Sequence, residues 1–131
     1  MVLAFALRAH VAAQFTNDKT ALEKAIAGDP DSRLRQIGSI AISGSGAAFT
    51  GTDCTTWNGH LVGDDYAIQG NMLIGPETLE AMQKSWLRDS SMALAERLMR
   101  VLEAGDQAGG DFRGKQSAAL KVMGREIYAE V

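Results

Sequence analysis

The sequence contains little of what marks disulfide-bonded, disordered or membrane-spanning proteins. Its 131 residues include 1 cysteine and 2 prolines, which excludes an internal disulfide and proline-rich disorder. No stretch approaches the roughly 20 apolar residues that a membrane-spanning helix needs. Arg8 and His10 interrupt the apolar run at the start of the chain, and the cationic segment that opens a secretion signal is missing. We therefore expect a soluble, cytoplasmic protein with no membrane partner.

Neither sign of charge dominates the chain. Thirteen Lys and Arg stand against 16 Asp and Glu, without the basic cluster that binds nucleic acid. The spacing of Cys54, His10 and His60 does not resemble a zinc site. We expect no metal, no cofactor and no nucleic-acid partner. The 46% hydrophobic content and the length are instead typical of one globular domain with a genuine core, here residues 1–131.

Hydrophobic periodicity predicts two amphipathic helices at the start of the chain. The apolar positions of the first have helical spacing: Ala4, Leu7, Val11 and Phe15. The second carries Leu22, Ala25 and Ile26 on one stripe. Gly28 is a helix stop signal. We expect these two helices to form a helical hairpin.

The period then changes to that of β structure. Apolar residues alternate with small or polar ones on both sides of Gly44-Ser45-Gly46, which can form the tight turn of a β-hairpin. A third strand is predicted over 66–69, and Gly70-Asn71 is interpreted as its end. The polar stretch 51–65 is interpreted as a structured loop with short extended pieces.

Two further helices and a second hairpin complete the prediction. Gly75-Pro76-Glu77 is a strong helix start, because proline at the first helical position loses only an unpaired N–H. Asp89-Ser90-Ser91 offers N-caps for the next helix, which Gly105 is expected to end. Strands are predicted at 118–122 and 127–131. Segregated helices and antiparallel strands indicate an α+β layered domain.

The chain has no strong catalytic motif: GxSxG, P-loop, HExxH, GxGxxG and CxxC patterns are all missing. Polar, glycine-rich segments gather instead at three predicted junctions of strand and helix, over residues 50–60, 69–76 and 108–117. Binding and catalytic residues concentrate in such segments.

These segments resemble a bacterial and archaeal family of unknown function placed in the Ntn (N-terminal nucleophile) hydrolase superfamily. The matching residues run in order over about 20–123: Leu34-Arg35-Gln36, Thr50-Gly51, Cys54, Trp57, Gly59-His60, Gln69-Gly70-Asn71, Gly75-Pro76, Gly109-Gly110-Asp111, Arg113-Gly114 and Gln116-Ser117. The resemblance implies a four-layer αββα sandwich with antiparallel sheets. It also implies a hydrolase of small amide or peptide-like compounds.

The chain departs from that family at both ends. Family members have two further strands before the first helix and usually a strand beyond Val131, so we expect a partial domain. Superfamily chemistry uses an N-terminal Thr, Ser or Cys whose α-amine serves as base, and Met1-Val2 supplies none of these. The 131-residue chain alone is therefore predicted not to hydrolyse amides by that mechanism. The alternative function is a noncatalytic small-ligand-binding or assembly domain with the same fold.

Six polar residues are the candidate pocket: His60, Gln69, Asn71, Asp111, Arg113 and Gln116. His60 is either a proton carrier or a loop histidine bonded to backbone. Asn71 either polarises a carbonyl or tolerates a left-handed turn. Gln69 and Gln116 either bind an amide or carboxyl group of a ligand or are buried structural residues that only make hydrogen bonds within the protein.

Each of the remaining candidate residues can also have a purely structural role. Asp111 and Arg113 straddle Phe112 and can pair, which either leaves the guanidinium to hold a ligand or only pins the loop. Cys54 is a possible nucleophile, but a buried, inert thiol is the favoured reading. Unpaired strand edges at 37–42 or 127–131 predict a homo-oligomer.

Overall fold

Helices and antiparallel strand pairs follow one another in the computed structural model, which describes residues 19–40, 44–88, 90–123 and 129–130. The elements are α1 (Lys19–Ala27), a 3-10 turn η1 (Ser32–Leu34), β1 (Gln36–Ile40), β2 (Gly46–Thr50), β3 (Trp57–Val62), β4 (Ala67–Leu73), α2 (Glu77–Arg88), α3 (Leu94–Gln107), β5 (Val122–Met123) and β6 (Ala129–Glu130). The described part is mixed α+β, as the sequence predicts. The helix predicted over residues 4–15, and hence its hairpin with α1, lies outside the described residues.

Two β-hairpins form the centre of the fold. β1 pairs with β2 from Gln36 opposite Thr50 to Ile40 opposite Gly46, which confirms the first predicted hairpin. β3 pairs with β4 from Trp57 opposite Leu73 to Val62 opposite Ala67. The stretch 51–65, predicted as a loop with short extended pieces, contains a six-residue strand, since Trp57–Val62 form β3.

The predicted end of the third strand was also wrong, because β4 continues through Gly70-Asn71 to Leu73. Gly70 stays in the ladder opposite Gly59. The Asn71 side chain donates a hydrogen bond to the Gln36 side chain at 3.1 Å. Pairing with β3 and this bond together outweigh the local preference of Gly-Asn for a turn.

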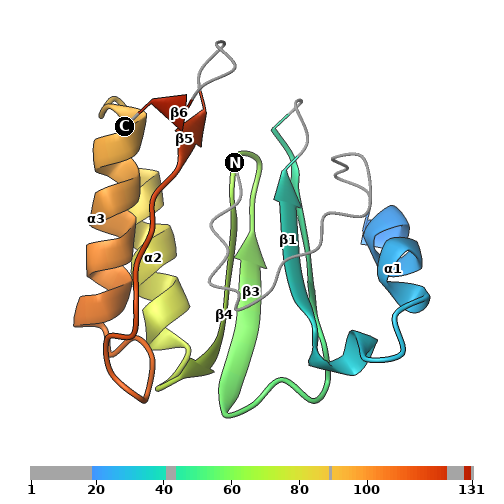
Figure 1. The fold of residues 1–131 in the computed structure, drawn as a ribbon. Helices are drawn as coiled ribbons and strands as arrows, with labels where there is room; N and C mark the ends of the chain where they lie inside the picture. Colours follow the sequence, from blue (N-terminus) through green and yellow to red (C-terminus); the bar gives the residue numbers. More distant parts are fainter. Residues whose placement is uncertain (1–18, 41–43, 89, 124–128, 131) are drawn as a thin grey trace.

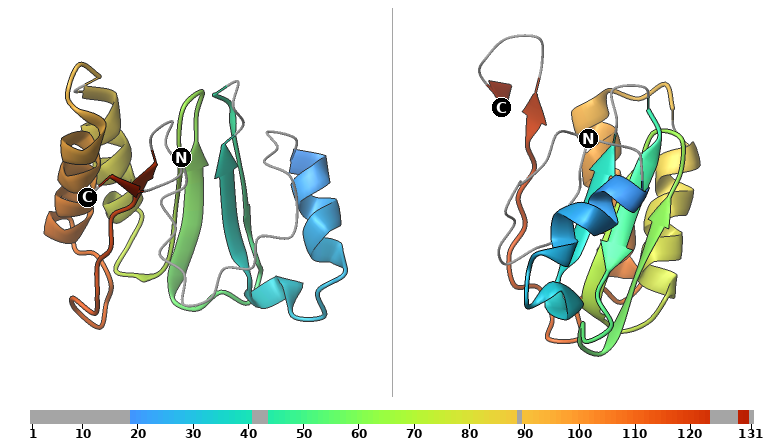
Figure 2. Two further views of the ribbon diagram at one scale, coloured as in Figure 1. Left: turned by 45° about the horizontal axis from the view of Figure 1, so that its top comes forward. Right: turned by 90° about the vertical axis from the view of Figure 1, so that its right-hand side faces the viewer.

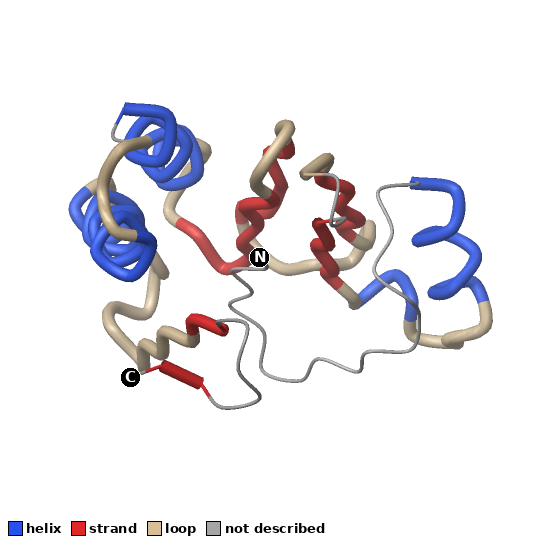
Figure 3. Tube along the Cα trace, turned by 90° about the horizontal axis from the view of Figure 1, so that it is seen from above, coloured by secondary structure: helices blue, strands red, loops and turns tan. Residues whose placement is uncertain are grey.

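The elements lie in successive layers (Figure 1): α2 and α3, then the β3–β4 hairpin, then the β1–β2 hairpin, then α1. Figure 2 and the view from above in Figure 3 show the same order. α2 contacts β3 and β4, both hairpins contact each other, and α1 contacts β2. The two strand layers therefore meet face to face, and helices cover their outer sides.

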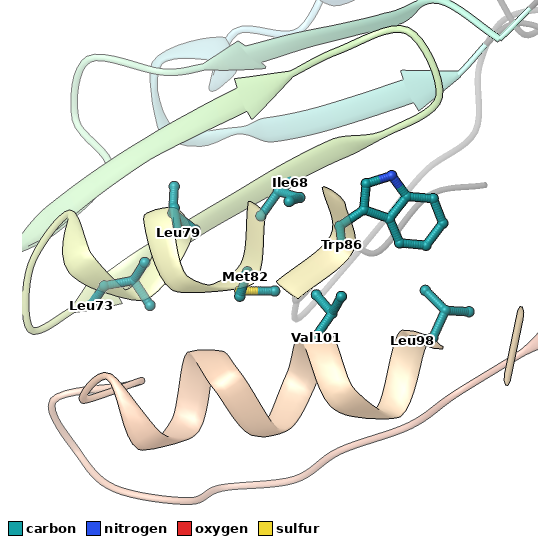
Figure 4. Packing of buried hydrophobic residues seen from close by; sticks show 7 residues of the cluster. All are labelled: Ile68, Leu73, Leu79, Met82, Trp86, Leu98 and Val101. Carbon is teal, nitrogen blue, oxygen red and sulfur yellow. The ribbon is translucent and has the colours of Figure 1, made fainter. Parts of the chain in front are cut away.

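The main core lies between β4 and the helix pair (Figure 4). Its buried residues are Ile68, Leu73, Leu79, Met82, Trp86, Leu98 and Val101. On the other side of the molecule, Leu22 and Ile26 of α1 and Ala47 and Ala48 of β2 are also buried. The stripe predicted for the second helix is thus the packing face of α1, except for Ala25, which is exposed.

The start of α2 follows the prediction, since Glu80 N–H donates to Pro76 O within the first turn. The boundaries predicted for α3 were wrong. The helix begins at Leu94, and its N-cap Ala93 makes no side-chain capping bond. Gly105 does not end the helix; it is buried against Met82. The left-handed residues Gly109 and Gly110, at φ 121° and 60°, follow the helix instead.

The second predicted hairpin is confirmed as a pairing, since β5 pairs antiparallel with β6. Of the first predicted strand, residues 118–121 lie before β5, which covers Val122–Met123, and the described part of the second is β6, Ala129–Glu130. Residues 124–128 between them lie outside the described part. In the part of the chain that the structure covers, no helix is long and apolar enough to span a membrane.

Candidate functional site

The Gln36 side chain crosses from the β1–β2 layer to the β3–β4 layer. The two N–H groups of its Nε2 are shared among three acceptors: Thr50 Oγ1 at 3.0 Å, Gly59 O at 3.0 Å and Gly70 O at 2.9 Å. Its Oε1 accepts from Asn71 Nδ2. One partly buried amide group therefore bonds to a residue of each of the other three central strands.

The residue before Gln36 is held by an ion pair and a backbone hydrogen bond. The preceding residue, Arg35, donates from Nε to Asp29 Oδ2 at 2.6 Å. The Asp29 carboxylate raises the pKa of Arg35, chiefly through this hydrogen bond. Arg35 O accepts from Gly51 N–H at 2.8 Å. The ends of β1 and β2 are thereby fixed beside each other, with Gln36 opposite Thr50.

His60 joins the same group of side chains. Its Nδ1 lies 2.8 Å from Thr50 Oγ1. His60 stands directly opposite Gln69 in the β3–β4 ladder. Residues directly opposite each other in a ladder lie on the same face of the sheet, so both belong to the face that meets β1–β2.

Alternation along β4 places Gln69 and Asn71 on that face, while Ile68 packs toward the helices. Met72 then adopts φ 58°, a left-handed conformation. The alternation breaks at this residue, and Leu73 enters the helix-side core although it is two residues after Asn71. We call the group Gln36, Thr50, His60, Gln69 and Asn71 the interlayer polar site.

Gln69 has an unsatisfied acceptor in this site. The residue is only 3% exposed, and its Oε1 has no hydrogen-bond partner. A Cβ atom at Gly38 of β1 would lie 2.0 Å from that oxygen, so only glycine leaves room for the Gln69 amide there. Leaving a buried acceptor unpaired costs about 1 to 3 kcal/mol, and such atoms often mark functional sites.

The three glycine-rich segments do converge at one end of the molecule, which is the lower end in Figure 1. Met72 N–H donates to Thr55 O at 3.1 Å, which joins the first segment to the second. Phe112 N–H donates to Met72 O at 2.9 Å, which joins the third. Leu73 and Asp111 form a β-bridge at the same point.

Convergence of the backbone does not bring all six candidate side chains together. Arg113 Nε donates to Asp111 Oδ1 at 2.9 Å, and the Asp111 carboxylate raises the pKa of Arg113. The Arg113 hydrogen bond in turn lowers the pKa of Asp111. Gln116 Nε2 donates to Arg113 O at 3.3 Å. The six candidates therefore form two groups: His60, Gln69 and Asn71 between the strand layers, and Asp111, Arg113 and Gln116 bonded to one another in the loop after α3.

Cys54 lies beside the interlayer polar site without joining it. Its Sγ donates to Arg35 O at 3.6 Å. Burial raises the pKa of the Cys54 thiol, which disfavours the thiolate that acts as nucleophile. The described residues hold no group of three or more His, Cys, Asp or Glu side chains arranged to bind a metal ion.

Gln36 and Thr50 were missed as site residues in the prediction. Both occur in the segments that carry the family resemblance. Their role depends on partners 10 to 35 residues away, and no local pattern in the sequence reveals such pairings.

Comparisons with known proteins support the part of the resemblance that concerns a family of unknown function. A search of curated proteins found no match. The crystal structure of protein SPO2555 from Silicibacter pomeroyi, described as DUF1028, is similar with a TM-score of 0.67 and 27% sequence identity. The match covers 72% of this chain and 42% of that one, so the chain spans less than half of that relative. The family model "Family of unknown function (DUF1028)" matches residues 7–131, and the chain belongs to this family.

Proposed function

We propose that this chain is the ligand-holding part of a hydrolase of the Ntn type, which acts on small amide or peptide-like compounds. The ligand binds at the interlayer polar site. The observation that carries the proposal is the meeting of Gln36, His60 and Asn71 between two strand layers, because a few convergent polar side chains fix the orientation of a small molecule in its binding site.

The order of layers supports the hydrolase class. Helices α2 and α3, two antiparallel hairpins and α1 follow one another, which is the order of an αββα sandwich. The similarity of the sequence segments to the Ntn superfamily supports the same assignment.

The chemistry of the site supports an amide-containing ligand. Its side chains are three amides, one hydroxyl and one imidazole. Amides offer N–H donors and C=O acceptors together, and a ligand amide offers the complementary pair. The Gln69 amide, whose Oε1 has no hydrogen-bond partner, adds a further amide group to this site.

A noncatalytic binding domain is the second candidate function. The raised pKa of the Cys54 thiol favours it, because this change removes the one cysteine as an activated nucleophile. Binding at the interlayer polar site is common to both candidates, so binding is the first property to test.

Calorimetric titration of the 131-residue chain with acetamide, N-acetylglycine amide and short dipeptides tests the proposal. We expect saturable binding that the Asn71→Ala variant weakens at least about tenfold, the effect of one lost hydrogen bond of about 1.4 kcal/mol. Gln107→Ala, which removes an exposed amide at the end of α3, is the control and should bind like the parent. Equal binding by both variants, or no binding by the parent, contradicts the proposal.

A further inference from the structure

We propose that Thr50 and His60 form a nucleophile and base pair that takes up the acyl group of an activated ester. The inference rests on the proposed function in one respect, since the pair belongs to the interlayer polar site. It goes further by assigning the reacting atom, Thr50 Oγ1.

The distance between the two side chains is that of a nucleophile and its base. Thr50 Oγ1 lies 2.8 Å from His60 Nδ1, within the 2.6 to 3.2 Å reach typical of such pairs. The residues come from different layers, Thr50 from the end of β2 and His60 from β3. Each is fixed by its own ladder, Thr50 opposite Gln36 and His60 opposite Gln69. Two paired strands therefore hold the hydroxyl against the imidazole.

A third side chain orients the hydroxyl. Gln36 Nε2 donates to Thr50 Oγ1 at 3.0 Å and so occupies an acceptor position of that oxygen. When His60 Nδ1 carries no proton, the hydroxyl hydrogen points to it. A base within hydrogen-bond reach is what activates a weak hydroxyl nucleophile.

The surroundings of the pair suit acyl transfer. The Thr50–His60 hydrogen bond is exposed, so a small reagent reaches it. Asn71 bonds to the other end of the Gln36 amide. Its Nδ2 has a second N–H, which can stabilise the negative charge that develops on a carbonyl oxygen.

Thr50 Oγ1 attacks the carbonyl carbon of an aryl ester and forms a C–O bond, while its proton passes to His60 Nδ1. The bond from that carbon to the aryl oxygen breaks, and the phenolate leaves with the electron pair. Water attacks the resulting threonine ester, again giving its proton to His60, and the carboxylic acid and Thr50 are restored.

The test is acetylation of the 131-residue chain with p-nitrophenyl acetate, followed by peptide mapping by mass spectrometry and by the release of p-nitrophenolate. We expect one acetyl group on the peptide that contains Thr50. Thr50→Ser should keep the modification and Thr50→Val should lose it. His60→Gln should slow it by about 100-fold or more, the usual contribution of a general base. Thr52→Val, which changes an exposed threonine two residues away, should react like the parent.

Acetyl groups only on other residues, or an unchanged rate in Thr50→Val or His60→Gln, overturn the proposal. Circular dichroism spectra identify any variant that has lost its fold. If Thr50→Val or His60→Gln has lost its fold, Thr50→Ser still tests the proposal, because a serine at this position must be acetylated. Ligand binding at the interlayer polar site without acetylation of Thr50 overturns this inference and leaves the proposed function standing. Acetylation of Thr50 without amide binding supports the pair and contradicts the proposed function.

Discussion

The side-chain amide of Gln36 bonds to three acceptors and one donor from β2, β3 and β4. This residue thus links the two hairpins, which are separate ladders. This role depends on contacts made only in the folded chain. It was therefore beyond prediction from local sequence, whereas the ion pair of Asp111 with Arg113 followed from their spacing of two residues.

Replacing the Gln36 amide should destabilise the fold. In Gln36→Leu, the partners of the amide lose their hydrogen bonds while the side chain keeps a similar size, and we expect a loss of about 2 kcal/mol in the free energy of unfolding. Urea denaturation measures this loss. Gln107→Leu, at an exposed position of α3, should change stability by about 0.5 kcal/mol or less. Equal effects of the two changes would argue against the amide as the link between layers.

The Asp111 carboxylate should make stability depend on pH in the acid range. Arg113 lowers its pKa below the ordinary value of 3.8. A lowered folded-state pKa stabilises the fold above the unfolded-state pKa, and this contribution disappears as the pH falls through the folded-state pKa. Asp111→Asn keeps an acceptor for Arg113 N–H but removes the charge. Thermal melts should show the variant less stable than the parent at pH 7 and equal to it in strong acid. A difference that grows with acid would contradict the assignment.

At the scale of elements, helix and strand predictions were best where a few adjacent residues determine the backbone conformation, and poorer where the conformation depends on distant partners. The Gly75-Pro76 start of α2 depends on the backbone chemistry of a few adjacent residues, and this prediction was confirmed. The antiparallel pairing of the first hairpin was confirmed as well, although Gly46 of the predicted turn lies in β2 opposite Ile40. β3 was missed because Asn58, Gly59 and His60 interrupt any apolar alternation. Its strand conformation comes from pairing with β4. Gly105 looked like a stop signal, but its small size serves the contact between α2 and α3.

Gly105→Ala should destabilise the protein although alanine favours helix. The new Cβ would lie 2.8 Å from Met82 Cγ and 2.9 Å from Met82 Sδ, and Met82 is buried in the core. The cost of overpacking should exceed the gain in helix propensity of about 1 kcal/mol, for a net loss of about 1 kcal/mol. Chemical denaturation measures it. In a Met82→Ala background the same change should become stabilising, and a loss of the same size there would refute the steric explanation.

On the scale of the whole molecule, the described residues form two hairpins between helices and the short pair β5–β6, each a two-stranded ladder. Two-stranded ladders leave strand edges that proteins usually pair or cover. The prediction of a homo-oligomer from the sequence is untested and stands as a proposal. Sedimentation velocity at micromolar concentration tests it: we expect a species larger than 14.0 kDa, and a stable monomer would contradict the proposal.

The central claim is that function resides between the two strand layers and not in the loop after α3. Side-chain amide resonances report on it directly, because Gln36, Gln69 and Asn71 each carry an NH2 group. We predict that titrating the labelled chain with a small amide shifts the side-chain signals of these three residues in ¹H–¹⁵N spectra and leaves those of Gln83 and Gln107 unchanged. Shifts confined to the backbone of residues 111–116, or no saturable shift at all, would contradict the claim.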